Sequence, residues 1–130
     1  MIRIDASGEK PIYEQIIDAV KENVLKGYWN AGDAIPSVRK LAFDLKITPN
    51  TAAKAYQELE RQKVIVTIRG KGTFIARHVP KKPDEEREAR VRGMMKNQIM
   101  ELVYMGYSRE QVLETAAELY EELKAQPDAE

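Results

Sequence analysis

The chain has no cysteine and a single histidine, His78. Without thiols it cannot form a disulfide or a thiolate metal site, and a lone histidine is a poor metal site. No stretch approaches the roughly 18 apolar residues that a membrane-spanning helix needs, and the first residues lack the apolar segment of a signal peptide. We therefore expect a soluble, cytoplasmic protein that uses no metal, no cofactor and no membrane.

Catalytic groups are equally scarce. With no thiol, one histidine and no carboxylate pair in an apolar frame, the sequence offers no constellation for covalent or acid–base catalysis. Gly70-Lys71-Gly72 is similar to part of a nucleotide-binding loop, but the full phosphate-loop spacing is missing and the segment joins two predicted strands. We expect no catalytic residue and no enzymatic activity.

At 130 residues the chain has room for one modest domain and an appendage, and its net charge of zero hides an uneven distribution. Residues 1–78 hold 13 Lys and Arg against 9 Asp and Glu, whereas residues 79–130 hold 8 against 12. The basic excess is greatest over residues 37–77, with nine against three. Such a segment suits phosphate binding. The net charges of the two halves of a protein often differ by this much, however, so the distribution alone does not establish it.

Residues 37–59 predict two short helices joined by a tight turn. Ser37 and Thr48 are good N-cap residues, and Pro49 occupies the first helical position after Thr48, where a missing N–H costs nothing. The pattern of the first helix stops at Lys46-Ile47. Apolar residues at helical spacing are Val38, Leu41, Ala42 and Leu45 in the first helix, and Ala52, Ala55, Tyr56 and Leu59 in the second.

A hairpin is predicted after these helices. Val64–Ile68 is β-branched throughout, Arg69–Gly72 has a turn composition, and Thr73–Ile75 is strand-like again. Gly70 and Gly72 let the tip turn sharply and approach another backbone closely. Helix, turn, helix and basic-tipped hairpin predict a winged helix-turn-helix, in which the second helix enters the major groove of DNA and the hairpin touches the flanking backbone.

A further helix precedes this pattern. Pro11 marks its start, and Gly27 follows its end. Trp29, in the next loop, either packs against this helix or stacks on a ligand or base. Residues 1–4 suit a short strand or an arm. The fold class that we predict is mainly α with a small β wing.

Spaced motifs run through the same region: Gly27-Tyr28-Trp29, Gly32-Asp33, Ile35-Pro36-Ser37-Val38-Arg39, Leu41-Ala42, Thr48-Pro49-Asn50-Thr51, Ala55-Tyr56, Leu59-Glu60 and Gly70-Lys71-Gly72-Thr73-Phe74. In order and spacing they resemble the DNA-binding domain of the GntR family of bacterial repressors over roughly residues 2–77. Pro11–Gln15, Pro49–Thr51 and the short C-terminal part are similar to the YtrA-type branch. Many relatives carry an arginine where Ala53 or Pro49 falls here, so their base contacts need not transfer.

Asn50 and Thr51 lie on the first turn of the second helix, the part of such a helix that reaches base edges. Asparagine can pair bidentately with adenine, and the threonine methyl group can meet a thymine methyl group. Lys54, one turn further on, fits a phosphate or a guanine, whereas Gln57 lies near the limit of reach. Tyr56 is expected in the core rather than at the DNA.

Arg39 lies one helical turn inside the helix-turn-helix. In the family that the chain resembles, an arginine at this position contacts DNA near the joint, and an ion pair with Asp44 or Glu58 is the structural alternative. The basic tip of the hairpin suits the minor groove or phosphates. The candidate DNA-binding residues are Ser37, Arg39, Thr48, Pro49, Asn50, Thr51, Lys54, Arg69, Gly70, Lys71 and Gly72.

The domain that we expect over residues 1–78 is followed by a linker, residues 79–83, with two prolines and two lysines. Residues 84–130 predict a helical hairpin, with one helix starting at Asp84 and a second at a capping box formed by Ser108 and Gln111. Such a hairpin encloses little core by itself. It must bury its apolar faces against something, and a symmetric partner would place two winged helices side by side.

We therefore expect the hairpin to form a homodimer interface. Four methionines, at positions 94, 95, 100 and 105, leave a pliable ligand site as the alternative use of this surface. The candidate dimerisation residues are Val91, Met95, Ile99, Leu102, Val112, Ala116, Leu119 and Leu123.

Together these features predict a sequence-specific DNA-binding repressor that reads an inverted-repeat operator in double-stranded DNA as a dimer. The YtrA-type resemblance implies a bacterial source and control of a neighbouring operon, often one encoding an ABC transporter. The rival interpretation is a winged helix used as a protein-interaction module, which would call for an apolar or acidic surface over residues 50–57. The sequence indicates no particular effector molecule.

Overall fold

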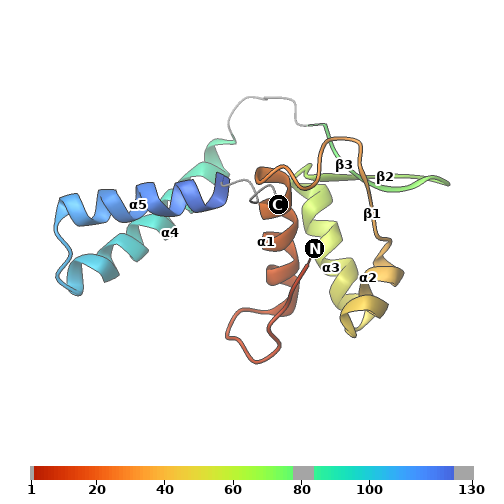
Figure 1. Ribbon diagram of the computed structural model, residues 1–130, viewed down its shortest axis with the longest axis horizontal. Helices are drawn as coiled ribbons and strands as arrows, with labels where there is room; N and C mark the ends of the chain where they lie inside the picture. Colours follow the sequence, from red (N-terminus) through yellow and green to blue (C-terminus); the bar gives the residue numbers. More distant parts are fainter. Residues whose placement is uncertain (1, 78–83, 125–130) are drawn as a thin grey trace, which may run out of the picture. The chain divides into compact units, whose positions relative to one another are not determined.

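A computed structural model describes residues 2–77 and 84–124, which group into two compact units on either side of the gap between those ranges. The first unit contains α1 (Ile12–Leu25), β1 (Ala34–Ile35), α2 (Val38–Leu45), α3 (Pro49–Arg61), β2 (Ile65–Ile68) and β3 (Gly72–Ile75) (Figure 1). The second contains α4 (Glu85–Tyr104) and α5 (Arg109–Lys124). His78, the predicted linker over residues 79–83, Met1 and the last six residues lie outside the described residues.

The two predicted helix starts in the first unit are formed by side-chain caps. Ser37 Oγ accepts a hydrogen bond from the backbone N–H of Lys40 at 3.1 Å, and Thr48 Oγ1 accepts one from that of Thr51 at 3.3 Å. Each bond satisfies a backbone donor that has no partner within its helix. Pro49 occupies the first position of α3 as predicted.

A three-stranded antiparallel sheet, ordered β1-β3-β2, supports the helices. Ile65 of β2 pairs with Ile75 of β3, and both side chains are buried. The hairpin of β2 and β3 was expected, but β1 was not. Its pairing of Ala34 with Phe74 fastens the loop after α1 to the wing.

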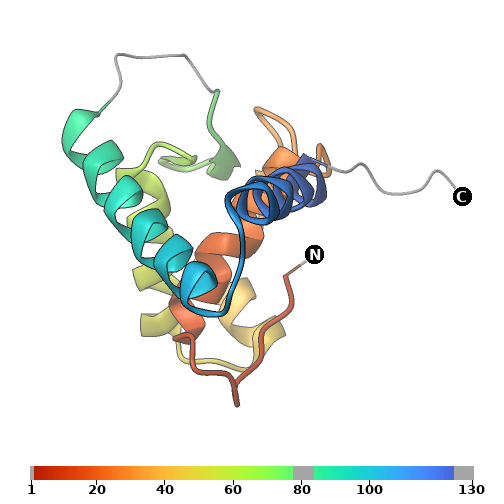
Figure 2. The same cartoon turned by 90° about the vertical axis from the view of Figure 1, so that its left-hand side faces the viewer.

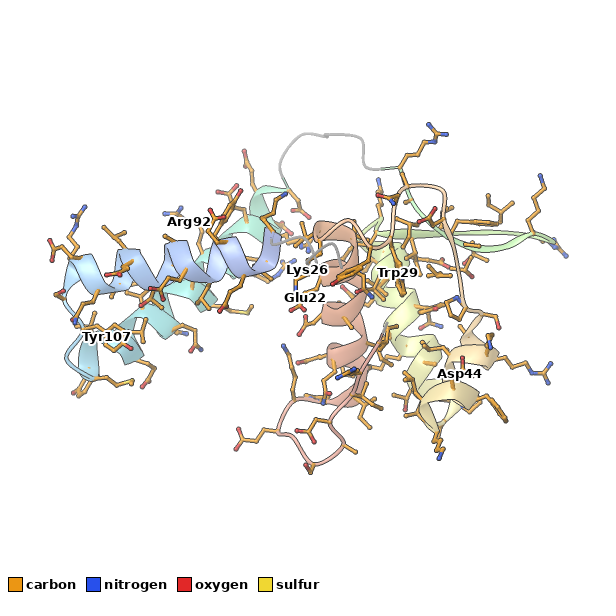
Figure 3. All side chains as sticks on the ribbon, in the orientation of Figure 1. Glu22, Lys26, Trp29, Asp44, Arg92 and Tyr107 are labelled. Carbon is orange, nitrogen blue, oxygen red and sulfur yellow. The ribbon has the colours of Figure 1, made fainter. Side chains whose placement is uncertain are left out.

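The core of the first unit lies between the helices and one face of the sheet, and α1 and α2 both pack against α3. Trp29 packs against this core (Figure 3). Its backbone N–H donates to the Asn23 carbonyl at 3.1 Å. This packing favours the structural interpretation of the tryptophan. Residues 2–4 form no strand, and Ile2 and Ile4 pack on the same core, whose buried members are Ile16, Ile17, Val20, Ile35, Leu41, Ala42, Ala52, Ala55, Tyr56, Leu59, Ile65 and Ile75.

The second unit is a helical hairpin. Asp84 caps α4 by accepting from the N–H of Arg87 at 3.1 Å, and the predicted capping box of α5 forms in both directions. Ser108 N–H donates to Gln111 Oε1 at 2.8 Å, and Gln111 N–H donates to Ser108 Oγ at 3.2 Å. The helices lie side by side only near their connecting turn (Figures 1 and 2), and none of their described residues is buried.

The predicted fold class is therefore confirmed as a mainly helical chain with a small antiparallel sheet. Neither unit, over the residues described, contains a helix with enough continuous apolar length to cross a membrane.

Candidate nucleic-acid interface

The joint between α2 and α3 is held by backbone geometry and one buried hydroxyl. Lys46 ends α2 in the left-handed region with φ of 57°, and the next N–H, of Ile47, donates back to the Ala42 carbonyl at 3.0 Å. Tyr56 of α3 donates its hydroxyl to the carbonyl of Pro36, just before α2, at 2.6 Å. Burial raises the pKa of Tyr56 to about 12, so the hydroxyl keeps its proton. The joint thereby fixes the start of α3.

The first turn of α3 presents two neighbouring polar residues with different freedom. Thr51 is half-buried, and its hydroxyl lies 2.9 Å from that of Thr48, so it takes part in the cap. Asn50 is exposed, and its side chain has no hydrogen bond to any described residue. Asn50 therefore offers a free amide at the helix N-terminus, where a base edge would pass in a helix-turn-helix complex.

Arg39 is exposed on α2 and pairs with neither of the carboxylates proposed as alternatives. Asp44 forms an ion pair with Lys40, with 3.4 Å between Lys40 Nζ and Asp44 Oδ2, and Glu58 accepts two hydrogen bonds from Arg61. The Arg61 bonds, followed by one from Gln62, lower the pKa of Glu58 to about 2. The structural alternative for Arg39 is thus wrong, because no ion pair joins it to either carboxylate.

The wing carries two exposed cations at its tip. Gly70 has φ of 79° and Gly72 has φ of 123°, backbone conformations that residues other than glycine rarely adopt. The tip is closed by a hydrogen bond of 2.9 Å from the Lys71 N–H to the Ile68 carbonyl. Within the described ranges, neither Arg69 nor Lys71 forms an ion pair, so both remain available to an anion.

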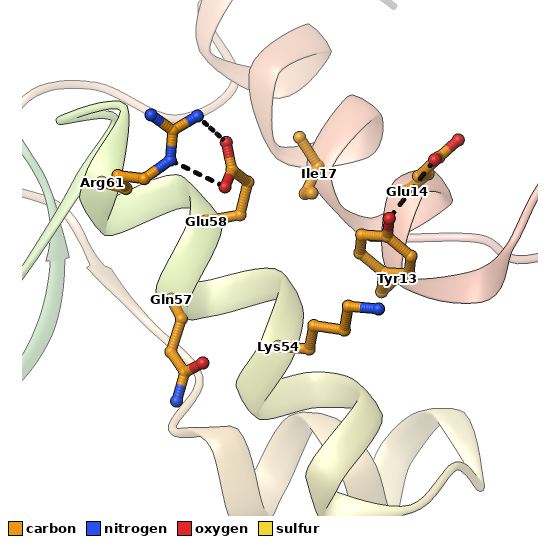
Figure 4. Close-up of a pocket in the computed structure, with 7 residues that line it drawn as sticks. All are labelled: Tyr13, Glu14, Ile17, Lys54, Gln57, Glu58 and Arg61. Carbon is orange, nitrogen blue, oxygen red and sulfur yellow. Dashed lines mark hydrogen bonds and ion pairs between the residues drawn. The ribbon is translucent and has the colours of Figure 1, made fainter.

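Lys54 behaves differently from the other candidate cations. Its ammonium lies 4.0 Å from the ring centroid of Tyr13, on α1. The two residues line an open groove of about 530 Å³ between α1 and α3, together with Gln57 (Figure 4). No local pattern predicts this contact, because it joins residues 41 positions apart. The remaining lining residues are Glu14, Ile17, Glu58 and Arg61.

Among the described residues, no group of three histidines or carboxylates lies close enough to hold a metal ion. The exposed end of α3, Arg39 and the wing belong to one compact unit. Their side chains are polar and cationic, which suits a phosphate backbone with base edges between its strands. Lys46, at the joint, is a further exposed cation that was not among the candidate DNA-binding residues. Its position in the predicted tight turn could have indicated that it is exposed near the start of α3.

The candidate dimerisation residues are exposed or half-buried in the single chain. Leu119 of α5 is 53% exposed, while Leu102 of α4 is half-buried. Removing such an apolar stripe from water would be favourable, and exposed stripes of this kind often mark interaction sites. Val91, Met95, Ala116 and Leu123 are exposed like Leu119, and Ile99 and Val112 are half-buried like Leu102.

Comparison with known proteins gives one consistent family. Residues 12–75 match the model for bacterial regulatory proteins of the gntR family. The chain is 40% identical over 124 residues to the HTH-type transcriptional repressor YtrA of Bacillus subtilis (strain 168), covering 95% of each chain. It matches the crystal structure of a transcriptional antiterminator from Listeria monocytogenes EGD-e with 41% identity and a TM-score of 0.90, covering 100% of this chain and 97% of that one.

A more distant structure is YtrA from Sulfolobus acidocaldarius, a GntR-family transcription factor. It is 27% identical with a TM-score of 0.56, covering 95% of this chain and all of that one. The similarity to both YtrA proteins extends well beyond the winged helix.

Proposed function

The chain belongs to the GntR family of bacterial regulatory proteins, and we propose on this premise that it is a transcriptional repressor that binds an inverted-repeat operator as a homodimer. The observation that carries the proposal is the free Asn50 amide at the start of α3, with the unpaired cations of Arg39 and the wing in the same unit. This combination supplies both parts of sequence-specific binding, since base-edge contacts discriminate and phosphate contacts fix the register.

We assign the base-reading role chiefly to Asn50, with the Thr51 methyl group beside it. Thr48 and Pro49 hold this turn in place, and the N-terminus of α3 favours a phosphate through its exposed N–H groups. The backbone-binding role falls to Ser37, Arg39, Lys54, Arg69, Gly70, Lys71 and Gly72.

The proposed division of labour places DNA binding in residues 1–78 and dimerisation in residues 84–130. Supporting it, the hairpin helices make few contacts with each other and leave most of their apolar stripe exposed in one chain. Two copies that cover each other's stripes would bring two winged helices into one assembly. A two-fold pair of winged helices matches the two half-sites of an inverted repeat.

We place the operator upstream of the protein's own gene, in an operon that encodes an ABC transporter. This follows from the resemblance to the YtrA-type branch. The test begins with mobility-shift titrations on duplexes from that upstream region, against a scrambled duplex of the same composition, at about 50 and 200 mM salt. We expect a preference for one inverted repeat and a steep loss of affinity with salt, because several cations displace counterions.

A charge-matched pair of variants sharpens this experiment. Arg69→Ala/Lys71→Ala removes two cations from the wing, whereas Arg92→Ala/Lys96→Ala removes two exposed cations from α4. The first variant should lose affinity for both duplexes, and the second should bind as the wild type does. If the wild-type protein binds no duplex, or binds with a flat salt dependence, the winged helix serves a protein partner instead.

A further inference from the structure

We propose that Tyr13 is a positioning residue for the DNA-binding surface, because its ring holds the Lys54 ammonium in place on the outer side of α3. The inference rests on the proposed function and deepens it by adding a residue of α1 to the apparatus that contacts DNA. Tyr13 itself touches no DNA in this proposal and acts only through Lys54.

The position of Lys54 within α3 gives the contact its relevance. Successive helical turns place Asn50, Lys54, Gln57 and Arg61 on one side of α3, opposite the buried side that contains Ala55. Lys54 therefore follows Asn50 by one turn on the exposed side. Figure 4 shows its side chain reaching from α3 toward Tyr13 on α1, where the ammonium lies 4.0 Å from the ring centroid.

A ring holds a cation without cancelling its charge, and this separates Lys54 from its neighbour Arg61. The Arg61 guanidinium is bound by the carboxylate of Glu58, which offsets its charge. The face of an aromatic ring attracts an ammonium through its quadrupole and occupies only one side of it. Lys54 thus keeps its full charge and has N–H donors left for a phosphate oxygen.

Tyr13 is suited to this task because it is itself fixed. It lies in the first turn of α1, is half-buried, and packs against the core that α1 shares with α3. Its hydroxyl donates to Glu14 Oε1 at 3.4 Å, which helps to orient the ring (Figure 4). A lysine side chain has four flexible bonds, and restraining it before DNA arrives reduces the entropy lost on binding.

The ring contact is tested first without DNA. In the NMR spectrum of the wild-type protein, the ε-methylene protons of Lys54 should be shifted upfield by the ring current. The shift should persist in Tyr13→Phe, which keeps the ring, and disappear in Tyr13→Leu, which removes it. Random-coil shifts for these protons in the folded wild type would overturn the proposal.

The consequence for binding is tested by a double-mutant cycle on the inverted-repeat duplex selected above. Tyr13→Leu should weaken binding about three- to fivefold, the fold-change expected for one exposed cation–ring contact. Tyr13→Phe should bind within about twofold of the wild type. In a Lys54→Met background, Tyr13→Leu should cause no further loss, because the restrained cation is already gone.

Three results would overturn the inference: wild-type affinity in Tyr13→Leu, an equal loss in the Lys54→Met background, or a loss in Tyr13→Phe as large as in Tyr13→Leu. Thermal melts accompany each variant, and Tyr13→Met, which is flexible and apolar, replaces Tyr13→Leu if the latter does not fold. Failure of the wild-type protein to bind any duplex would instead overturn the proposed function, even with the NMR contact intact.

Discussion

At the scale of single residues, the difference between Asn50 and Thr51 decides which of them is free to read a base. From the sequence alone the two residues cannot be distinguished, because both are polar and adjacent on the first turn of a helix. In the structure the Thr51 hydroxyl is engaged with Thr48, whereas the Asn50 amide faces solvent. A side-chain amide can donate and accept at once, as the edge of adenine requires. Asn50 is therefore the better candidate for discrimination.

We predict that Asn50→Ala weakens binding to the operator by about 1–3 kcal/mol and flattens the preference at one base position. Lys71→Ala is the contrasting variant, because a phosphate contact carries no sequence information. It should weaken operator and scrambled DNA about equally and lower the salt slope by roughly one. Titrations of both variants on both duplexes at two salt concentrations measure these effects. Unchanged discrimination in Asn50→Ala would move the reading role to Thr51, to Lys54 or to DNA shape.

Two lysines sit in a backbone conformation that suits glycine better. Lys46 has φ of 57° and Lys63 has φ of 62°, and both side chains are exposed. The left-handed conformation costs a residue with a Cβ about 1–2 kcal/mol. Glycine avoids this strain, and the extra conformational entropy that it loses on folding costs less, about 0.5–1 kcal/mol. We predict that Lys46→Gly and Lys63→Gly each stabilise the fold by about 0.5 kcal/mol.

The control for these variants is Lys26→Gly. Lys26 ends α1 with φ of −81°, an ordinary right-handed conformation in which glycine brings no relief. This variant should be destabilised, by about 0.5–1 kcal/mol. Urea denaturation of all three proteins at one protein concentration gives the comparison. A loss of stability in Lys46→Gly and Lys63→Gly would mean that their side chains contribute more than the strain removes.

At the scale of elements, local chemistry made most of the fold predictable. Ser37, Thr48, Asp84 and Ser108 each cap the helix that the sequence assigned to them, because a cap needs only residues within one turn. The strand β1 was not predicted, because it depends on a contact between residues far apart in the sequence. Two residues have no period of their own, and Ala34–Ile35 becomes a strand only by pairing with β3, about 40 residues further on.

The candidate site divides in the same way. Asn50, Thr51 and the wing glycines followed from helix caps and turn composition, which are local. Arg39 pairs with neither Asp44 nor Glu58, which pair instead with Lys40 and Arg61 about one turn away on their own helices. The contact of Lys54 with α1 depends on the packing of two helices, which no spacing in the sequence records.

The connection of α3 to the segment before α2 gives a prediction at this scale. Tyr56→Phe removes the hydroxyl that donates to the Pro36 carbonyl, and should cost about 1 kcal/mol of stability at neutral pH. Burial raises the pKa of Tyr56 to about 12 in the folded chain, from the ordinary tyrosine value of 10.0. Between these values the unfolded chain releases the proton that the folded chain retains, so stability falls as pH rises from 10 to 12.

In Tyr56→Phe this contribution to the alkaline loss should vanish, and the decline in stability from pH 10 to 12 should become shallower. Tyr28→Phe is the matched control, because Tyr28 is exposed and its hydroxyl has no buried backbone partner to lose among the described residues. It should keep both the neutral stability and the alkaline decline of the wild type. Equal alkaline curves for the wild type and Tyr56→Phe would show that the buried hydroxyl titrates normally.

At the scale of the whole molecule, the charge and the apolar surface are divided between the two units. The winged-helix half carries the basic excess and a buried core, whereas the hairpin half is acidic and has no buried residue among those described. Acidic surfaces are repelled by DNA, so we expect the hairpin to add nothing to the proposed DNA contact. What the hairpin offers instead is the apolar stripe of α4 and α5, and covering that stripe is the most direct way for it to gain stability.

We predict that Leu102→Asp/Leu119→Asp yields monomers and greatly weakens operator binding while the winged helix stays folded. A symmetric dimer would bury four of these leucines, each worth about 1.5–3 kcal/mol at full burial, so even partial burial implies more than a hundredfold loss in dimer affinity. Leu119→Asp alone gives a cleaner first step, because Leu119 is 53% exposed in the single chain and contributes little to its own unit.

Tyr104→Asp provides the matched control on the same hairpin. Tyr104 is 89% exposed and lies on the side of α4 opposite the stripe through Leu102, so the same charge placed there should leave the dimer intact. Analytical ultracentrifugation reports the assembly state, and circular dichroism confirms that the helices persist. If the double variant remains dimeric, the stripe is not the interface. If Tyr104→Asp is monomeric as well, any acidic charge on the hairpin prevents assembly, and the assignment to this stripe fails.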